Sequence, residues 1–154
     1  MSLLNPDYVR KVCEGISKAP YFELLSMSLK SFDIGSSVLE IELQGKHLQP
    51  FGFVHGGVFC SIIDAAAFWA LWAELDETNG ITSVDLKLNY LAPAQHGRLT
   101  AVGRRIKLGK TLGLADVEVT DAAGKVVAHG SSTLMVIPGF KFQGQDGLPS
   151  KFLP

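Results

Sequence analysis

Residues 54–75 read VHGGVFCSIIDAAAFWALWAEL, and this stretch decides the fold. From Val58 to Ala73 it is apolar on nearly every helical face, and such a helix has to be covered by other structure. The run is 16 residues long and carries Asp64 near its centre. A membrane span needs about 20 apolar residues and rarely holds a central carboxylate. We therefore predict a buried helix from Gly57 to about Glu77 in a soluble domain.

Most of the chain after this helix has the pattern of β-strands. Alternating apolar and β-branched residues predict four strands, at 81–91, 99–106, 112–120 and 125–137. The last three are joined so tightly that an antiparallel meander is the simplest arrangement. Before the helix, a further strand pair is predicted at 27–32 and 38–43, joined by a turn at 33–36.

The chain begins with a helical pattern. From Pro6 to Lys18 apolar residues recur at helical spacing, with Asn5 as a candidate cap and Pro6 placed to start the first turn. Pro20 interrupts this helix, and residues 21–25 predict one more turn.

The length of 154 residues fits one domain with a substantial core. We divide the chain into an N-terminal helical segment (1–25), a main domain (26–138) and an irregular C-terminal tail (139–154), which is ordered only if it docks. The predicted class is α+β, with one long antiparallel sheet wrapped around one central helix and an additional N-terminal helix.

Composition argues against several functions. A formal net charge of −1 provides no broad positive field for nucleic acid. Cys13 and Cys60 lie in apolar helical contexts without a signal peptide, so we expect a reducing cytoplasmic setting and no disulfide framework. No metal is predicted, because the histidines are scattered without ligand spacing: His47, His55, His96 and His129.

Two consecutive glycines, Gly56 and Gly57, open the central helix. They let another molecule approach the backbone, and the unpaired N–H groups of the first turn point at it with the helix dipole behind them. This is a site for a carbonyl oxygen that becomes anionic. Asp64 lies seven residues after Gly57, which is about two turns further on nearly the same face.

Asp64 has two interpretations. An average helix carboxylate is solvated or paired with a cation. Here no basic residue lies between Val58 and Leu75, so burial of Asp64 would be costly without compensation. We take it as a candidate catalytic carboxylate.

His55 precedes the glycines and suggests a nucleophile–histidine pair. No Ser stands in a Gly-x-Ser-x-Gly context, however. The more ordinary interpretation is that His55 hydrogen-bonds the backbone and holds the glycine turn.

Taken together, these motifs resemble the hotdog-fold acyl-CoA thioesterases of the phenylacetate-pathway type. The resemblance runs from residue 48 to 136 and rests on HGG at 55–57, Asp64 nine residues after His55, SVDLKLNYLAP at 83–93 and GKTL at 109–112. It implies that the helix is the centre of a hotdog fold and that the Gly57 N–H polarises the thioester carbonyl. It further implies that Asp64 from the partner subunit activates water or attacks directly, and that Ser83 positions the water.

Two positions depart from the simplest pattern. Many family members have Asn six residues before the histidine, where this chain has Gln49; its longer amide can make the same hydrogen bonds. Strict alternation puts Ser83 on the face opposite Val84 and Leu86. Only a β-bulge or the start of the strand would turn Ser83 inward.

Basic residues surround the predicted turn at 109–111. The side chains of Arg105, Lys107 and Lys110 are long enough to contact the diphosphate or ribose phosphate of coenzyme A. The alternative is an ordinary solvated hairpin tip. The resemblance adds further substrate or coenzyme contacts: Gly56, Tyr90, Gly109 and Thr111.

The function implied is hydrolysis of acyl-CoA to free acid and coenzyme A, in a homodimer or homotetramer whose sites span the subunit interface. No metal, redox cofactor, nucleic acid or membrane partner is expected. The acyl group, aromatic or aliphatic, stays open; Phe51, Phe53, Phe68, Trp69 and Trp72 suit a pocket for either.

Two alternatives remain. A non-catalytic acyl-CoA-binding module is disfavoured by the intact Asp64. A hydratase on the same fold should pair an Asp with a His a few residues further along a helix, but the next histidine after Asp64 is His96, in a predicted turn.

Overall fold

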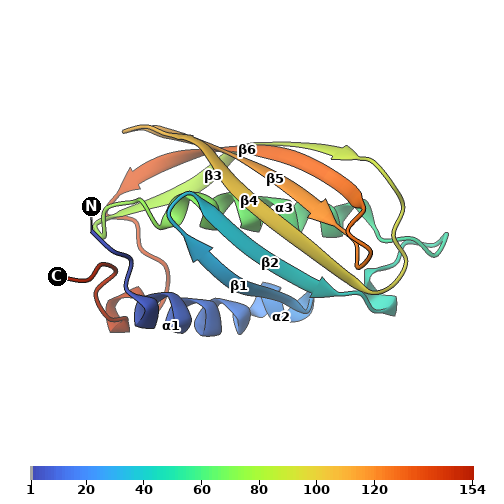
Figure 1. The fold of residues 1–154 in the computed structure, drawn as a ribbon, viewed down its shortest axis with the longest axis horizontal. Coiled ribbons are helices and arrows are strands. Elements are labelled where there is room, and N and C mark those ends of the chain that lie inside the picture. Colours follow the sequence, from blue (N-terminus) through green and yellow to red (C-terminus); the bar gives the residue numbers. More distant parts are fainter. Residues whose placement is uncertain (1) are drawn as a thin grey trace.

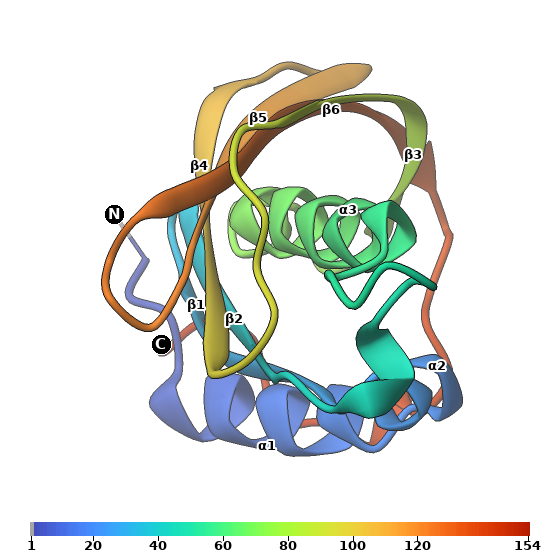
Figure 2. The ribbon, with the colours of Figure 1, turned by 90° about the vertical axis from the view of Figure 1, so that its right-hand side faces the viewer.

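The computed structural model describes residues 2–154, in which six strands form one antiparallel sheet curled around a long helix (Figures 1 and 2). The helices are α1 (Pro6–Ser17), α2 (Pro20–Leu24) and α3 (Gly56–Trp72). The strands are β1 (Met27–Asp33), β2 (Ser36–Glu42), β3 (Asn79–Tyr90), β4 (Arg98–Leu108), β5 (Leu112–Thr120) and β6 (Val126–Pro138). Single 3₁₀ turns cover Gly45–His47 and Gln145–Gly147. The predicted α+β class, with its wrapped helix and N-terminal helix, is confirmed.

The strands follow the order β1-β2-β4-β5-β6-β3, and every neighbouring pair is antiparallel. The meander predicted for the last three strands is therefore confirmed. β3 precedes β4 in the chain but pairs with β6, so it forms one edge of the sheet and β1 the other. In residues 2–154 neither edge has a partner on its outer side.

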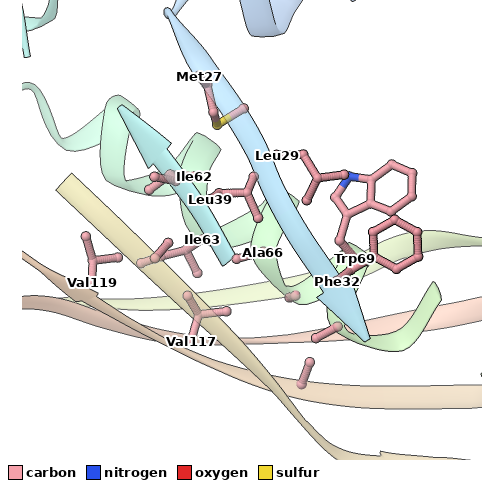
Figure 3. Close-up of a cluster of buried hydrophobic side chains, with 14 of the residues drawn as sticks. Met27, Leu29, Phe32, Leu39, Ile62, Ile63, Ala66, Trp69, Val117 and Val119 are labelled. Carbon is pink, nitrogen blue, oxygen red and sulfur yellow. The ribbon is translucent and has the colours of Figure 1, made fainter. Parts of the chain in front are cut away.

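Helix α3 lies against the concave face of the sheet. Ile62, Ile63 and Ala66 of α3 are fully buried and face the sheet, where Leu39 and Val117 are also buried (Figure 3). A Cβ atom on Gly103 of β4 would stand 2.3 Å from the Ala66 carbonyl oxygen, so only glycine allows this close approach of helix and strand.

The predicted end of the central helix at about Glu77 is wrong, because α3 ends at Trp72. The following backbone tightens: the Leu75 N–H donates to the Trp72 carbonyl at 3.2 Å, three residues back. The last carbonyls of a helix have no partner within it. Here the Lys151 amine donates to the carbonyl of Trp72, the last residue of α3, and also to the carbonyl of Leu75 in the segment that follows.

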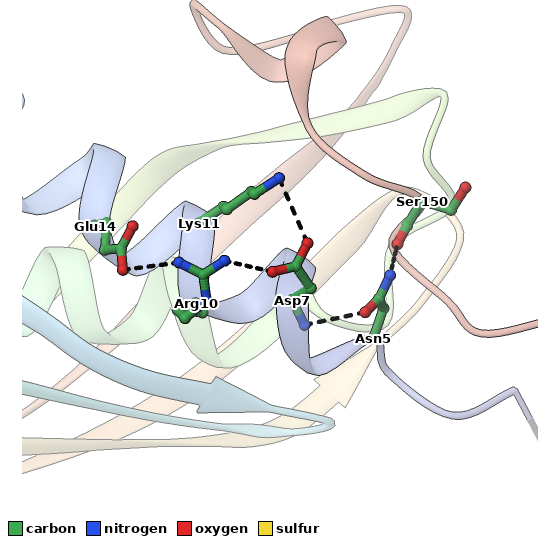
Figure 4. Close-up of polar contacts among 6 residues, drawn as sticks. All are labelled: Asn5, Asp7, Arg10, Lys11, Glu14 and Ser150. Atoms are coloured by element: carbon green, nitrogen blue, oxygen red, sulfur yellow. Dashed lines mark hydrogen bonds and ion pairs between the residues drawn. The ribbon is translucent and has the colours of Figure 1, made fainter.

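Helix α1 begins as predicted. The Asn5 side chain accepts a hydrogen bond from the Asp7 N–H at 3.0 Å and so caps the helix (Figure 4). Its amide nitrogen also donates to the Ser150 carbonyl at 2.9 Å. Exposed charges flank the cap, with Arg10 between Asp7 and Glu14. Asn5 thus joins the start of α1 to the C-terminal tail.

The C-terminal tail has little regular structure and is docked. Lys151 is only 2% exposed, and its carbonyl accepts from the Asn5 N–H at 2.8 Å. Its own N–H donates to the Glu77 carboxylate at 2.7 Å. The tail is therefore docked, as an ordered tail requires. The division into segments 1–25, 26–138 and 139–154 stays a prediction, and residue 1 lies outside the described residues. No helix in residues 2–154 is long and apolar enough to cross a membrane.

The buried amine of Lys151 predicts that the stability of the fold depends on pH. Burial lowers the pKa of Lys151 from 10.5 to about 8, so between these values the unfolded chain binds a proton that the folded chain has released. Stability from this group therefore rises with pH across that window. We expect the free energy of unfolding of the wild type, minus that of Lys151→Met, to rise by about 1.4 kcal/mol per pH unit there. Urea denaturation at several pH values would show this, and a constant difference would contradict the assignment.

Candidate active site

Asp64 and Ser83 lie together where α3 faces β3. The Ser83 hydroxyl donates a hydrogen bond of 2.7 Å to the Asp64 carboxylate. Asp64 is half-buried, and the segment around it on α3 carries no cation. The carboxylate therefore keeps one oxygen held by Ser83 while staying accessible to a small molecule.

A β-bulge in β3 brings Ser83 to this position. Ser83 pairs with Leu134 and Asp85 with Thr133, so Val84 is an extra residue between two consecutive partners. The alternation shifts by one at the bulge, so Ser83, although exposed, lies on the α3 side of β3 together with Leu86, an odd number of residues away. The bulge that the strand pattern required is present.

Asp64 borders two cavities. The larger, of about 490 Å³, lies between α3, the two N-terminal helices and the tail, and is lined mostly by apolar side chains. The smaller, of about 400 Å³, lies between α3, the first half of β3 and the tail. Phe68 and Trp69 line the larger cavity and Phe68 and Trp72 the smaller, as the sequence suggested, whereas Phe51 and Phe53 line neither.

The first turn of α3 is closed by His55. Its Nδ1 accepts a hydrogen bond of 2.7 Å from the Gly57 N–H and caps the helix. This is the bond expected of a histidine that holds the glycine turn. In this conformation the Gly57 N–H reaches a carbonyl oxygen only if His55 turns away or shares the donor.

Gln49, Gly56 and Tyr90 line a third cavity, of about 490 Å³, at the start of α3. The Tyr90 hydroxyl donates to the Gly56 carbonyl at 3.2 Å. The Gln49 side chain accepts from the Phe51 N–H within its own loop. These three predicted residues are thus brought together, at a place distinct from Asp64 and Ser83.

Within one chain, the residues at the start of α3 lie apart from Asp64 and Ser83. Gly57 and Asp64 share a stripe of α3 but are separated by seven residues, or roughly 10 Å along the axis. A reacting carbonyl must lie about 3 Å from its hydrogen-bond donor and within reach of the base. Asp64 and Gly57 of one chain are too far apart for that.

The basic turn is exposed at the tip of the β4–β5 hairpin. The Gly109 N–H donates to the Leu112 carbonyl at 2.8 Å, and the side chains of Lys107, Lys110 and Thr111 are open to solvent. Leu112 and Thr82 both pair with Met135, so the turn lies at the Ser83 end of the sheet.

Two of the predicted coenzyme contacts do not fit this turn within one chain. Arg105 is not part of the cluster, because its guanidinium pairs with Glu74 beyond the end of α3. Tyr90 pairs with Ala128 at the far end of β3, away from Thr82 and the turn. Neither position could be judged without knowing the strand register.

Other groups near Asp64 were not predicted. The Tyr21 hydroxyl lies 2.6 Å from the Ser61 hydroxyl, and Phe142 of the tail borders both cavities next to Asp64. An exposed-looking aromatic in a short N-terminal turn or in an irregular tail carries no signal of this kind.

Cysteine and metal chemistry find little support here. Burial and then the charge of Asp64 raise the pKa of the Cys60 thiol, so it stays protonated and weakly nucleophilic near neutral pH. In the part of the chain that the structure describes, no three His, Cys, Asp or Glu side chains are grouped so as to hold a metal ion.

The fold and site can be compared with known proteins. The profile of the thioesterase superfamily matches residues 51–128. Human acyl-coenzyme A thioesterase 13 is 31% identical over 129 residues, covering 81% of this chain and 91% of that protein. This chain therefore belongs to the thioesterase superfamily, and it is a thioester hydrolase.

Solved structures agree with this assignment. A mutant thioesterase from Pseudomonas aeruginosa is 26% identical with a TM-score of 0.80, covering 89% of this chain and 99% of that chain. The PaaI protein of the Escherichia coli phenylacetic acid degradation operon, at 22% identity, shares the fold with a TM-score of 0.75 over 84% of this chain and 93% of that chain. The predicted hotdog fold is confirmed.

Proposed function

We propose that this protein hydrolyses acyl-CoA thioesters to a free acid and coenzyme A, at sites built from two copies of the chain. The observation that carries the proposal is the Asp64 carboxylate, held by the Ser83 hydroxyl at 2.7 Å on the rim of an apolar cavity. A carboxylate beside space for an apolar group suits attack on the carbonyl of a non-polar acyl chain. The named relative is an acyl-CoA thioesterase.

In this mechanism Asp64 takes a proton from a water that attacks the thioester carbonyl, or attacks the carbonyl itself. The C–S bond then breaks and coenzyme A leaves as the thiol with a proton that originates from water. After direct attack by Asp64, a water hydrolyses the resulting mixed anhydride and frees the acid and the carboxylate. Ser83 orients the carboxylate and the water. The Gly57 N–H binds the carbonyl oxygen, on which negative charge develops, once His55 shares or releases it. Gln49 and Gly56 line the place where the thioester would enter. No step requires a metal or a redox cofactor.

A second copy supplies the missing partner. In a twofold dimer two α3 helices run antiparallel, so Gly57 of one copy comes beside Asp64 of the other when the axis passes between Cys60 and Ser61. The free edge of β3 carries Val84 and Tyr90, which are 53% and 59% exposed. An unpaired edge with apolar side chains favours pairing with another strand. We propose a homodimer, or a dimer of dimers, in the cytoplasm.

The alternatives are less well supported. A module that only binds acyl-CoA needs no carboxylate oriented by a hydroxyl. A hydratase needs a histidine near Asp64 on the helix, but His55 is bonded to Gly57 at the helix start and His96 follows β3 in a loop.

The direct experiment is a thiol-detecting assay with a panel of acyl-CoA substrates. Release of one free coenzyme A per acid formed, with many turnovers per subunit, is the expected result. Tight binding of acyl-CoA without release of thiol would instead support the binding module.

The coenzyme end predicts a separate effect. If Lys110 and Lys107 contact phosphate groups, Lys110→Ala should raise KM for acyl-CoA while leaving kcat nearly unchanged, because the contact is equal in ground and transition states. The effect should shrink with rising salt, since exposed charges are screened over a Debye length of about 8 Å at physiological salt.

The matched control is Lys125→Ala, which removes an exposed lysine from the β5–β6 hairpin instead. An acyl-pantetheine thioester, which lacks the nucleotide, should not respond to Lys110→Ala. Equal losses of kcat/KM on both substrates, or no loss on acyl-CoA, would show that this turn is an ordinary solvated hairpin tip.

A further inference from the structure

The C-terminal tail covers the C-terminal part of α3 on a side that the sheet leaves open. After β6 it crosses below the end of the helix toward α1 (Figure 2). Phe142 inserts its ring against α3, with ring centres 6.2 Å from Trp69 and 5.3 Å from Trp72. The same side chain borders both cavities next to Asp64. Phe142 is thus a wall shared by the two cavities.

Another part of the cavity wall comes from the N-terminal segment. Ile16 of α1 and Phe22 of α2 line the larger cavity together with Phe142. Both parts of the wall lie outside residues 51–128, which match the superfamily profile. The shared domain supplies Asp64 and its helix, whereas the terminal segments of this chain shape the adjoining space.

The polar groups of the larger cavity are already paired. The Tyr21 and Ser61 hydroxyls bond each other at 2.6 Å, and the Ser61 hydroxyl also donates to the Gly57 carbonyl at 2.9 Å. Beyond Asp64 and the Cys60 thiol, the side chains that line the cavity are otherwise apolar. A hydroxyl or charge on a ligand would lose its hydration there without gaining a partner.

The Phe142 wall is fixed by the fold. Before it, a Cβ on Gly80 would stand 2.3 Å from the Phe140 carbonyl oxygen, so the tail lies directly on β3. After it, the buried Lys151 amine donates to the carbonyl of Trp72, at the end of α3, and to that of Leu75 just beyond it. Phe142 therefore lies between two points at which the tail contacts the rest of the fold.

We propose that Phe142 is the specificity-determining residue of this thioesterase: it forms the end wall of the cavity beside Asp64 and limits the length of a hydrocarbon acyl group. The inference rests on the proposed function. A volume of about 490 Å³ lies within the range of small-molecule pockets. Phe142 acts on the acyl chain and takes no part in the chemical step.

The test is a chain-length profile of kcat/KM with butanoyl-, octanoyl-, dodecanoyl- and hexadecanoyl-CoA. Phe142→Ala should shift the profile to longer chains, raising the long-to-medium ratio of kcat/KM by at least about 10-fold, the lower end of what one methylene contributes in an apolar pocket. Phe142→Trp should shift the profile the other way. Opposite shifts from the two variants would not follow from a merely structural role.

The control is Leu153→Ala, which shortens a half-exposed side chain of the same tail that lines no cavity next to Asp64. Its profile should match wild type. Thermal unfolding checks that each variant is folded, and Phe142→Leu, a milder truncation, replaces Phe142→Ala if the latter unfolds. An unchanged profile in the folded Phe142 variants would overturn the proposal.

A second substrate pair tests the chemical class. A terminally hydroxylated dodecanoyl-CoA should be hydrolysed with kcat/KM about 10- to 100-fold below that of dodecanoyl-CoA. Equal values would show that the acyl end reaches water or a polar partner, against the assigned cavity.

A binding measurement separates this inference from the proposed function. Both tryptophans of the chain, Trp69 and Trp72, contact Phe142, so brominated fatty acids entering the cavity should quench tryptophan fluorescence. Quenching without any acyl-CoA hydrolysis would overturn the proposed function and leave the cavity assignment standing. Hydrolysis without quenching, and without a profile shift in the Phe142 variants, would overturn the cavity assignment and leave the proposed function standing.

Discussion

The Asp64→Asn variant is expected to fold like the wild-type protein and to hydrolyse acyl-CoA at least about 100 times more slowly, because a general base contributes about 10²–10⁴ and a nucleophile more. The amide has the same shape and can still accept the hydrogen bond from Ser83. It can neither take a proton from water nor attack the carbonyl. The loss should therefore appear in kcat, with thermal unfolding close to wild type.

Two further variants serve as comparisons for Asp64→Asn. Ser83→Ala removes the hydroxyl that orients Asp64 at 2.7 Å, and we expect a smaller loss than for Asp64→Asn. Asp85→Asn changes an exposed carboxylate two residues beyond Ser83, past the bulge, and should leave turnover unchanged. If Asp64→Asn kept wild-type turnover, Asp64 would be a structural residue and the mechanism would be wrong.

Gly57→Pro should lower kcat by about 10²–10³, the usual cost of removing one donor to a developing oxyanion. Proline lacks the N–H and is tolerated in the first turn of a helix. Gly57→Ala keeps the N–H and should lose much less. Its Cβ would stand 2.9 Å from the His55 Nδ1, so the imidazole has to shift slightly.

His55→Ala separates catalysis from capping at the same donor. It removes the acceptor of the Gly57 N–H, which should cost about 1 kcal/mol of stability, as for other helix caps. It leaves the N–H free for a carbonyl. If the N–H served only as a cap, Gly57→Pro and His55→Ala would cost similar stability and neither would slow the reaction at saturating substrate.

The elements that depend on local pattern could be predicted from the sequence. Asn5 caps α1, and the glycine pair starts α3 at Gly56, one residue before the predicted start. Asp64 stands out because an isolated carboxylate within a wholly apolar helix needs a reason. Strand periodicity also showed that Ser83 could face the helix only with a β-bulge or at the start of the strand, and the structure contains a bulge at Val84.

The features that depend on distant contacts could not be predicted. The end of α3 is stabilised by Lys151, 79 residues after Trp72. The Arg105 guanidinium does not join the basic turn, because it pairs with Glu74, which the fold brings close to it. Phe142 sits in an irregular tail with no periodicity, so its contact with Trp72 arises only from the path of the docked chain.

The central claim is that each site joins Gly57 of one copy to Asp64 of another, and subunit mixing tests it most directly. Asp64→Asn and Gly57→Pro proteins, each nearly inactive alone, are unfolded together, refolded together and assayed. We expect about a quarter of wild-type turnover per subunit, since half of randomly assorted dimers are mixed and each mixed dimer has one intact site. Activity that stays at the level of the separate variants, although mixed dimers have formed, would place the whole site within one chain and contradict the claim.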